Sequence, residues 1–154
     1  MNIAVYCAAS QSNCPAFDTK TEELGKWMAQ NHHTLVYGGG NTGLMGVVAT
    51  AVMNEGGEVI GVMPQFFVDR EIAKQDITKL HIVDTMSERK NQMIALSEVY
   101  IALPGGPGTL EEIAEVVSWV RVGQTNGICI FYNMEGYYDH LEAFFDKMVE
   151  TNLL

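Results

Sequence analysis

Short apolar runs alternate with longer amphipathic stretches along the whole chain, and this alternation predicts strands and helices in turn. The apolar runs are rich in Val, Ile and Tyr, which favour strands, whereas the longer stretches repeat their apolar positions at helical spacing. Strands are predicted at Ile3–Cys7, Thr34–Tyr37, Glu58–Met63, Leu80–Val83, Val99–Leu103 and Ile128–Tyr132. Helices are predicted at about Phe17–Asn31, Gly43–Glu55, Met86–Ser97, Thr109–Val122 and Tyr137–Thr151.

Strands that alternate with helices build βαβ units, in which neighbouring strands run parallel and helices cover both faces of the sheet. No linker, internal repeat or low-complexity segment interrupts the pattern between residues 1 and 154. The pattern therefore predicts a single α/β domain with a Rossmann-like, doubly wound parallel sheet. Ligands of such sheets bind outside the carboxyl ends of the strands, near the point where the strand order reverses. Functional residues are accordingly expected in the turns that follow the strands.

The charge of the chain narrows the range of its partners. With 9 Lys and Arg against 19 Asp and Glu, the formal net charge is −10. This charge disfavours nucleic acid and anionic membranes as partners. No apolar run approaches the ~20 residues that a membrane-spanning helix requires. Any phosphate site must therefore rely on backbone dipoles and a few well-placed cations.

The cysteines and histidines give no sign of a metal site. Cys7, Cys14 and Cys129 have neither metal-ligand nor redox spacing. The 4 histidines form no set with acidic residues or cysteines that is typical of a metal centre. We therefore expect no metal. The first residues, Met1–Tyr6, lack a basic leader and are predicted to form a strand and not a signal peptide, so we expect a cytoplasmic protein.

The most informative segment joins a predicted strand to a predicted helix through a Pro-Gly-Gly-Pro-Gly turn. Val99–Leu103 leads into Pro104–Gly108, and the helix is predicted to begin at Thr109. Such a turn presents backbone N–H groups at a helix N-terminus, where hydrogen bonds and the helix dipole hold phosphate. Glu112 is predicted to lie in the first turn of this helix, beside the place of such an anion. An acid at this place suggests chemistry on a phosphorylated molecule rather than binding alone.

Thr109 and Glu112 also have a purely structural interpretation. Thr-x-x-Glu is a capping box, in which the hydroxyl and the carboxylate satisfy backbone donors at the start of a helix. The upstream glycines argue against this interpretation, because they already present donors to a ligand. Glu111 and Glu115 moreover make the helix start acidic without Glu112. On local grounds both interpretations stay open.

A second glycine turn, Gly38–Gly43, follows a predicted strand and fits the G-x-G-x-x-G pattern. The next strand ends at Val62–Pro64 without the acid that a dinucleotide site uses to hold the ribose. A mononucleotide or sugar-phosphate site therefore fits better than NAD, with Gly39 and Gly40 as candidate binding residues. A tight turn that only permits close packing of helix and strand is the alternative.

The predicted helix from Met86 carries cations at an unusual place. Helical spacing aligns Arg89 with Met86 and Met93, on the apolar stripe that faces the sheet. Arg89 and Lys90 also fall near the helix start, where the dipole disfavours positive charge. A solvated surface pair does not explain a guanidinium on the inward face. An anion or a carboxylate partner at this place would explain it.

These motifs resemble those of the Lonely guy (LOG) family of cytokinin-activating phosphoribohydrolases, whose members are also labelled possible lysine decarboxylases. The family signature is P-G-G-x-G-T-x-x-E preceded by an R-K pair. Pro104–Glu112 matches the first part without a gap, and Arg89–Lys90 matches the second. Gly38–Gly46 matches the family's other glycine turn. The resemblance covers nearly the whole chain.

The resemblance implies hydrolysis of the N-glycosidic bond of a nucleoside 5′-monophosphate, either AMP or an N6-substituted, cytokinin-type analogue. The products would be the free base and ribose 5-phosphate. It also implies that Arg89 and Glu112 are catalytic and that no cofactor takes part. The substrate-binding residues that it implies, together with those of the second glycine turn, are Glu71, Lys90, Gly106, Pro107, Gly108, Thr109, Leu110, Glu111, Ser118, Gly39 and Gly40.

The chain departs from the family pattern in three respects. Ser87 stands where the family usually has histidine, and Ala8–Ser10 replaces a Gly-Ser-Ser turn. Both changes can alter contacts to the base or the ribose, but neither removes a catalytic residue. The chain ends at Leu154, whereas relatives usually continue with a further strand and helix, and both a short family member and a truncated chain stay open.

Two other functions deserve comparison with this one. A lysine decarboxylase would hold pyridoxal phosphate on a lysine, and Lys90, the only lysine near the predicted site, lacks the surroundings of a cofactor lysine. A non-catalytic nucleotide or molybdenum-cofactor carrier shares this fold but would not need both Arg89 and Glu112. The intact pair therefore favours an enzyme.

The helix predicted at Thr109–Val122 also bears on assembly, because it is apolar around most of its circumference. A sheet covers only one stripe of a helix, so we expect the rest to pack against a second copy of the chain. A two-fold homodimer is the simplest closed arrangement. The alternative is a monomer in which a further C-terminal segment covers the same surface.

Overall fold

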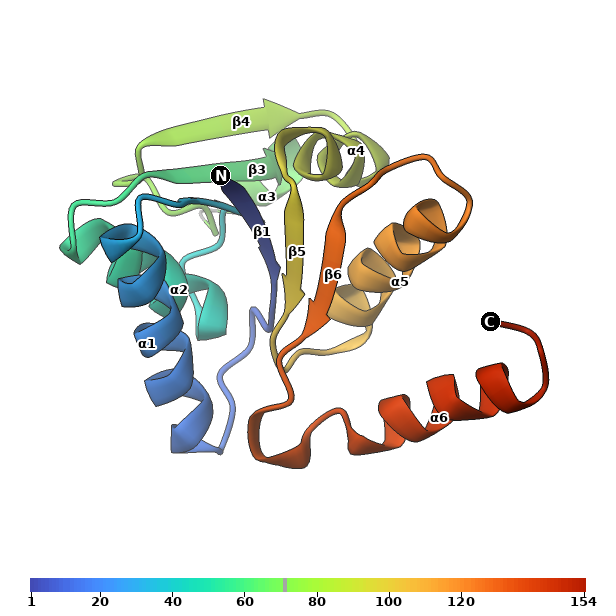
Figure 1. Ribbon diagram of the computed structural model, residues 1–154. Helices are drawn as coiled ribbons and strands as arrows, with labels where there is room; N and C mark the ends of the chain where they lie inside the picture. Colours follow the sequence, from blue (N-terminus) through green and yellow to red (C-terminus); the bar gives the residue numbers. More distant parts are fainter. Residues whose placement is uncertain (71) are drawn as a thin grey trace.

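Six parallel strands form one sheet in the order β4-β3-β2-β1-β5-β6 (Figure 1). The computed structural model describes residues 1–70 and 72–154. All neighbouring strands pair in parallel, with β1 in the interior between β2 and β5. Each predicted strand is confirmed to within one residue at either end. The strands are β1 (Asn2–Tyr6), β2 (Thr34–Tyr37), β3 (Val59–Pro64), β4 (Lys79–Val83), β5 (Val99–Ala102) and β6 (Ile128–Phe131).

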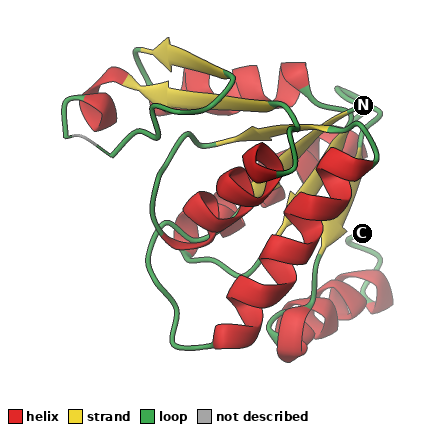
Figure 2. Cartoon of the chain, turned by 90° about the vertical axis from the view of Figure 1, so that its left-hand side faces the viewer, coloured by secondary structure: helices red, strands yellow, loops and turns green. Residues whose placement is uncertain are grey.

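Helices cover both faces of this sheet, which confirms the prediction of a doubly wound α/β fold. Figure 1 shows α1 and α2 on one side of the strands and α4 and α5 on the other, and Figure 2 has the first pair in front. The helices are α1 (Pro15–Gln30), α2 (Gly43–Asn54), α3 (Gln65–Val68), α4 (Met86–Leu96), α5 (Pro107–Arg121), the 3₁₀ turn η1 (Met134–Gly136) and α6 (Asp139–Glu150).

The core lies in two layers, one on each face of the sheet. In β1 the side chains of Ile3 and Val5 join the layer beneath α1 and α2, while Ala4 and Tyr6 join the layer beneath α4 and α5. All four are buried, because a parallel strand in the middle of a covered sheet has no solvated face. This explains why its sequence is a continuous apolar run rather than an alternating one.

Two helix starts show how local sequence defines the elements around the site. Thr85 caps α4, because its hydroxyl oxygen accepts from the backbone N–H of Glu88 at 3.1 Å. The Glu88 carboxylate in turn accepts from the backbone N–H of Asp84 at 2.9 Å. α5 begins at Pro107, two residues before the predicted start at Thr109. Proline favours the first position of a helix, because its fixed φ suits the helix and its missing N–H has no partner there.

The two shortest described helical segments, α3 and η1, were not predicted from the sequence. A helix of four residues is too short to show the apolar periodicity from which helices are predicted. The last helix, α6, extends away from the sheet in Figure 1 and leaves the apolar side chain of Phe144 57% exposed. Within residues 1–70 and 72–154, no helix combines the length and the apolarity that a membrane crossing requires.

Candidate active site

The strand order reverses at β1, and a cavity opens at this point of the sheet. From β1 the chain builds outward through β2, β3 and β4, and then returns to add β5 and β6 on the other side. The carboxyl ends of β1 and β5 therefore lead into turns that diverge, which is where ligands of doubly wound sheets bind. The cavity measures about 430 Å³, within the range of small-molecule sites. Its lining includes Cys7, Ala8, Ala9, Ser10, Gly38, Gly40, Met45, Met63, Phe67, Ile72, Met86, Arg89, Gly106, Gly108, Thr109, Glu111 and Glu112.

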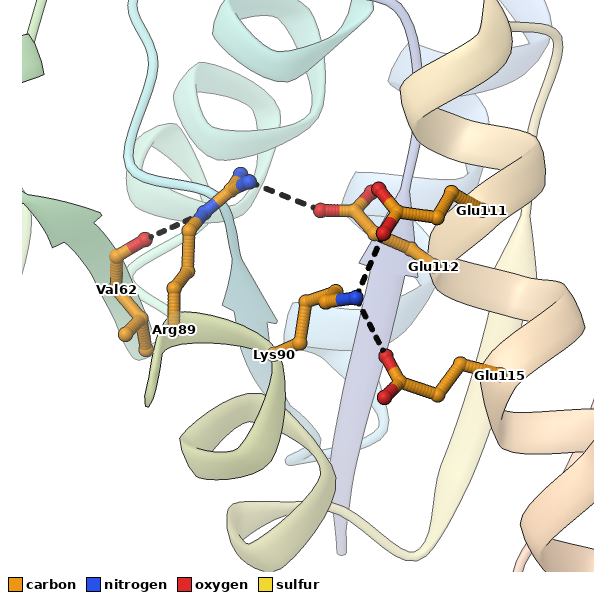
Figure 3. A network of polar contacts seen from close by, with 6 residues as sticks. All are labelled: Val62, Arg89, Lys90, Glu111, Glu112 and Glu115. Atoms are coloured by element: carbon orange, nitrogen blue, oxygen red, sulfur yellow. Dashed lines mark hydrogen bonds and ion pairs between the residues drawn. The ribbon is translucent and has the colours of Figure 1, made fainter. Parts of the chain in front are cut away.

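A buried ion pair in the lining of this cavity joins α4 to α5. Arg89 Nη1 of α4 lies 3.0 Å from Glu112 Oε1 of α5, and the two side chains are only 7% and 6% exposed (Figure 3). Arg89 Nε also donates to the carbonyl oxygen of Val62 in β3, at 3.0 Å. The guanidinium is thus held between a strand end and a helix. This confirms that Arg89 faces inward towards a carboxylate.

The surroundings of Glu112 alter its acidity. Burial away from water raises the pKa of this carboxyl above the ordinary range of a glutamate, and the charge of Arg89 opposes that shift in part. A carboxyl whose pKa is raised by burial holds a proton more readily than a solvated glutamate, which suits it to exchange a proton with water or a substrate. The pair therefore combines a polarised, desolvated carboxyl with a cation that fixes its position.

The start of α5 excludes the capping-box interpretation of Thr109 and Glu112. The residue that precedes the helix is Gly106, and no described side chain caps its N-terminus. Thr109 therefore lies inside the first turn, where it cannot cap, and the carboxylate of Glu112 is engaged by Arg89 instead. The first turn of a helix has N–H groups without helical acceptors. These donors remain for a ligand.

The glycines of this turn differ in what they make room for. A Cβ at Gly105 would lie 2.1 Å from Thr109 Oγ1, so this glycine lets the threonine fold back over the turn. A Cβ at Gly106 or Gly108 would meet no described atom within 4 Å. Neither of these two residues has a positive φ. Neither the packing nor the backbone of this chain thus requires glycine at position 106 or 108. The two glycines leave open space beside the N–H donors at the start of the helix.

Lys90 lies beside the buried pair and is held by two carboxylates of α5. Its Nζ is 2.7 Å from Glu111 Oε1 and 2.9 Å from Glu115 Oε2 (Figure 3). The hydrogen bonds to Glu111 and then to Glu115 raise the pKa of Lys90, so its ammonium stays protonated. Lys90 therefore joins α4 to α5 outside the cavity lining.

One apolar part of the lining was not predicted as part of the site. It is formed by Met45 of α2, Met63 of β3, Phe67 of α3 and Met86 of α4, together with Ile72. The Ile72 carbonyl accepts from the backbone N–H of Asn41, which pins this segment to the second glycine turn. Only the tertiary structure brings these side chains together, so no local pattern of the sequence indicates them.

The structure brings together most, but not all, of the residues proposed from the sequence. Arg89, Glu112, Glu111, Thr109 and three glycines (Gly40, Gly106 and Gly108) line the cavity. Of the described residues, Gly39, Lys90, Pro107, Leu110 and Ser118 lie outside that lining. Gly39 has a φ of +81° and serves the turn itself, and Ser118 is exposed farther along α5. Glu71 lies outside the described residues.

The geometry of the site also bears on metals and on pyridoxal phosphate. Among the described residues, no group of three or more His, Cys, Asp or Glu is arranged to hold a metal ion. No lysine of the described chain lines the cavity. A Schiff-base lysine must lose its proton, which burial or neighbouring cations promote. Lys90 has the opposite surroundings, so these residues do not fit pyridoxal phosphate.

Residues 45–154 match the family model described as "Possible lysine decarboxylase". The chain is 41% identical over 152 residues to "Probable cytokinin riboside 5'-monophosphate phosphoribohydrolase LOGL6" of Oryza sativa subsp. japonica, covering 99% of this chain and 61% of the relative. It is also 41% identical to "Cytokinin riboside 5'-monophosphate phosphoribohydrolase LOG1" of Arabidopsis thaliana, covering 99% of this chain and 71% of the relative.

Solved structures with the same fold include a carrier protein and a binding protein for molybdenum cofactor. A carrier protein from Chlamydomonas reinhardtii superposes with a TM-score of 0.73 at 21% identity, over 96% of this chain and 83% of the other. A binding protein from Rippkaea orientalis superposes with a TM-score of 0.65 at 19% identity, over 94% and 96%. At these identities the likeness concerns the fold alone. The much closer match to the plant sequences shows that the chain belongs to the LOG family, as its motifs suggested.

Proposed function

We propose that this protein hydrolyses the N-glycosidic bond of a nucleoside 5′-monophosphate and releases a free base and ribose 5-phosphate. The observation that carries the proposal is the buried pair of Arg89 and Glu112 beside an uncapped helix start. The names of the plant relatives describe the same reaction. Because the chain spans 61% of the length of the first relative and 71% of the second, the activity has to be measured on this chain itself.

The 5′-phosphate is assigned to the turn at the start of α5. Gly106 and Gly108 leave open space at this turn, and the N–H groups of the first helical turn point towards an anion at the N-terminus. The carboxyl of Glu112 lies one turn further along the same helix. A nucleotide anchored by its phosphate thus has its ribose near Glu112, and the apolar wall around Met45 and Phe67 is left for the base.

The reaction needs water and a group that manages a proton. The oxygen of water bonds to C1′ of the ribose as the bond from C1′ to the base nitrogen breaks. The electron pair of that bond goes to the base, which takes up a proton, while the attacking water loses one. Glu112 in its ionised form stabilises the positive charge that develops on the ribose and accepts the proton of the water.

The remaining residues act by placing these groups. Arg89 holds the carboxylate of Glu112 in one position and lowers the cost of keeping it ionised in a buried place. Binding of the remote phosphate orients the ribose over the carboxylate, which converts binding energy into rate. The carrier alternative leaves the desolvated ion pair without a role, since binding alone does not require it.

The proposal is tested by incubating the purified protein with AMP or with isopentenyladenosine monophosphate and separating the products by chromatography. We expect adenine or isopentenyladenine together with an equal amount of ribose 5-phosphate. Nucleotide binding without release of base would instead support the carrier alternative. An absorbance spectrum of the same preparation tests the decarboxylase alternative, for which a pyridoxal band would have to appear.

We further propose that the protein works as a homodimer in the cytoplasm. α5 and the residue that follows it leave Val120 and Val122 36% and 64% exposed, and such a surface suits a second copy. Ser118, which lies outside the lining of its own cavity, would face the partner from the same helix. The thiols of Cys7, Cys14 and Cys129 are free, which is typical of a reducing compartment.

A further inference from the structure

Gly38 lies directly beneath the guanidinium of Arg89. A Cβ built on Gly38 would be 1.8 Å from Arg89 Nη2 and 3.0 Å from Arg89 Cζ, with Met45 Cε next at 3.2 Å. A separation of 1.8 Å is impossible for atoms that are not bonded, so the guanidinium occupies the volume that any side chain at position 38 would take. Gly38 follows β2 directly, which places this volume at the carboxyl end of the sheet.

The backbone gives no other reason for glycine at this position. Gly38 is absent from the glycines with positive φ, whereas Gly39 and Gly43 of the same turn have φ values of +81° and +58°. An alanine could therefore adopt the backbone conformation of Gly38 without strain. What an alanine could not do is leave the guanidinium where it is.

We propose that Gly38 is a positioning residue, whose missing side chain provides the slot in which Arg89 holds Glu112. The role rests on the proposed function, because it makes Gly38 serve the catalytic pair. The slot has three fixed sides: the backbone of Gly38, the carbonyl oxygen of Val62 at 3.0 Å from Arg89 Nε, and the carboxylate of Glu112. Any side chain at position 38 removes the first side and displaces the guanidinium from the other two.

The expected consequence of Gly38→Ala is a folded protein with a disordered catalytic pair. The nearest obstacles, Arg89 and Met45, are the far ends of flexible side chains and can move away. The displaced guanidinium loses its hydrogen bond to Val62 and its contact with Glu112, which leaves a buried carboxylate without its partner. The fold tolerates this change, and the reaction does not.

Nuclear magnetic resonance tests the slot without any use of the activity. The chain has only three arginines, Arg70, Arg89 and Arg121, so the Nε–H signal of Arg89 is assigned from its loss in Arg89→Met. In the native protein this proton is buried and bonded to Val62, and we expect slow exchange with water. In Gly38→Ala we expect exchange to be faster by about tenfold or more. Unchanged exchange would overturn the proposal.

A double-mutant cycle gives a second, independent test. If Gly38 acts through Arg89, then Gly38→Ala lowers the melting temperature in the native background and has no further effect in the Arg89→Met background. Equal losses in both backgrounds would mean that Gly38 serves the fold alone and would overturn the proposal. Should Gly38→Ala fail to fold, folding of the double variant supports the slot, and failure of both overturns it.

Gly57→Ala is the matched control. A Cβ at Gly57 would lie 2.7 Å from Ala29 Cβ and 2.8 Å from Val52 Cγ1, so this variant is also crowded, but beneath α1 and α2 and outside the cavity lining. We expect it to lose stability and to keep the slow exchange of Arg89.

With AMP, Gly38→Ala should lower kcat by about 100-fold while KM changes by less than about threefold, because the turn at the start of α5, which is assigned to the phosphate, is intact. If the native protein releases no base, the proposed function is refuted. The exchange and melting experiments still show whether Gly38 provides the slot for Arg89.

Discussion

The hydroxyl of Tyr138 donates to the carbonyl oxygen of Leu103 at 2.6 Å and ties the segment before α6 to the end of β5. The neighbouring Tyr137 donates to the carbonyl oxygen of Gly105 at the same distance. The two tyrosines thus hold the strand end and the glycine turn from which α5 begins. Burial raises the pKa of Tyr138, so its phenol stays protonated and remains a donor.

Replacement of Tyr138 by phenylalanine should therefore loosen the end of β5, from which the glycine turn begins. The change leaves a buried carbonyl without its donor, and we expect the free energy of unfolding to fall by about 1–2 kcal/mol in urea titrations. Tyr137→Phe is the comparison, since its side chain is more exposed and water can replace the lost bond. A larger loss for Tyr137 than for Tyr138 would contradict this explanation.

Glu112→Gln keeps the shape of the side chain and removes its charge. We expect release of base to fall by about 10²–10⁴-fold, the range that a single positioned acid–base group contributes. The circular dichroism spectrum should be unchanged, because glutamine can still accept a hydrogen bond from Arg89. Retention of most of the activity would show that Glu112 is structural and would refute its catalytic role.

The pH dependence of the reaction should reflect the buried position of Glu112. Because burial raises the pKa of this carboxyl, the activity should decline with falling pH at a higher value than for a solvated glutamate. The free energy of unfolding should change in the opposite direction, so that it decreases as pH rises. Since the pKa is higher in the folded than in the unfolded chain, the contribution of this group to the free energy of unfolding decreases as pH rises between the two values.

Urea titrations at several pH values measure this contribution, and Glu112→Gln is the control that lacks it. The difference in free energy of unfolding between the native protein and this variant should shrink steadily as pH rises through that interval. A difference that is constant with pH would mean that the pKa of Glu112 is the same in both states.

Gly108→Ala should separate binding from folding. A Cβ at this position meets no described atom within 4 Å, and alanine favours a helix more than glycine does, so the melting temperature should not fall. The same methyl group would occupy space assigned to the phosphate, and we expect KM for AMP to rise by about tenfold, or 1.4 kcal/mol. Adenosine, which lacks the phosphate, should be a far poorer substrate than AMP. Equal rates for adenosine and AMP would refute the assignment of the phosphate to this turn.

Light scattering at micromolar concentration tests the proposed homodimer. We expect a mass near twice the 17.0 kDa of the chain. Val122→Asp places a charge on the exposed apolar surface that follows α5 and should shift the mass towards that of a single chain. A mass of 17.0 kDa for the native protein would refute the dimer.

The fold and the inward direction of Arg89 were predictable for local reasons, whereas its pairing with Glu112 was implied by the family resemblance. The alternation of apolar runs and amphipathic stretches is strong, and every predicted strand is present. The inward direction of Arg89 followed from its helical alignment with Met86 and Met93, and its side chain is indeed buried. A cation on an apolar stripe needs a partner, and the structure supplies Glu112.

The parts that escaped prediction depend on contacts between distant segments. Met45, Met63 and Phe67 meet only because three elements converge on one cavity, and nothing near each residue indicates this. The glycine at position 38 is explained by a side chain from α4, far along the chain. The start of α5, by contrast, could have been predicted from local sequence. Pro107 is a residue type that favours the first position of a helix, and this preference indicates a start before Thr109, which the capping-box interpretation does not allow.

The charges around the cavity also affect how a nucleotide arrives. Among the described lining residues, Arg89 is the only lysine or arginine, and it is paired with the carboxylate of Glu112 on a chain of net charge −10. Under the proposed function, a phosphorylated substrate diffuses towards a chain whose net charge has its own sign and is then held by uncharged N–H dipoles. Added salt screens that repulsion. Encounter with the substrate thus becomes faster as ionic strength rises, the reverse of a phosphate site that attracts its ligand with free cations.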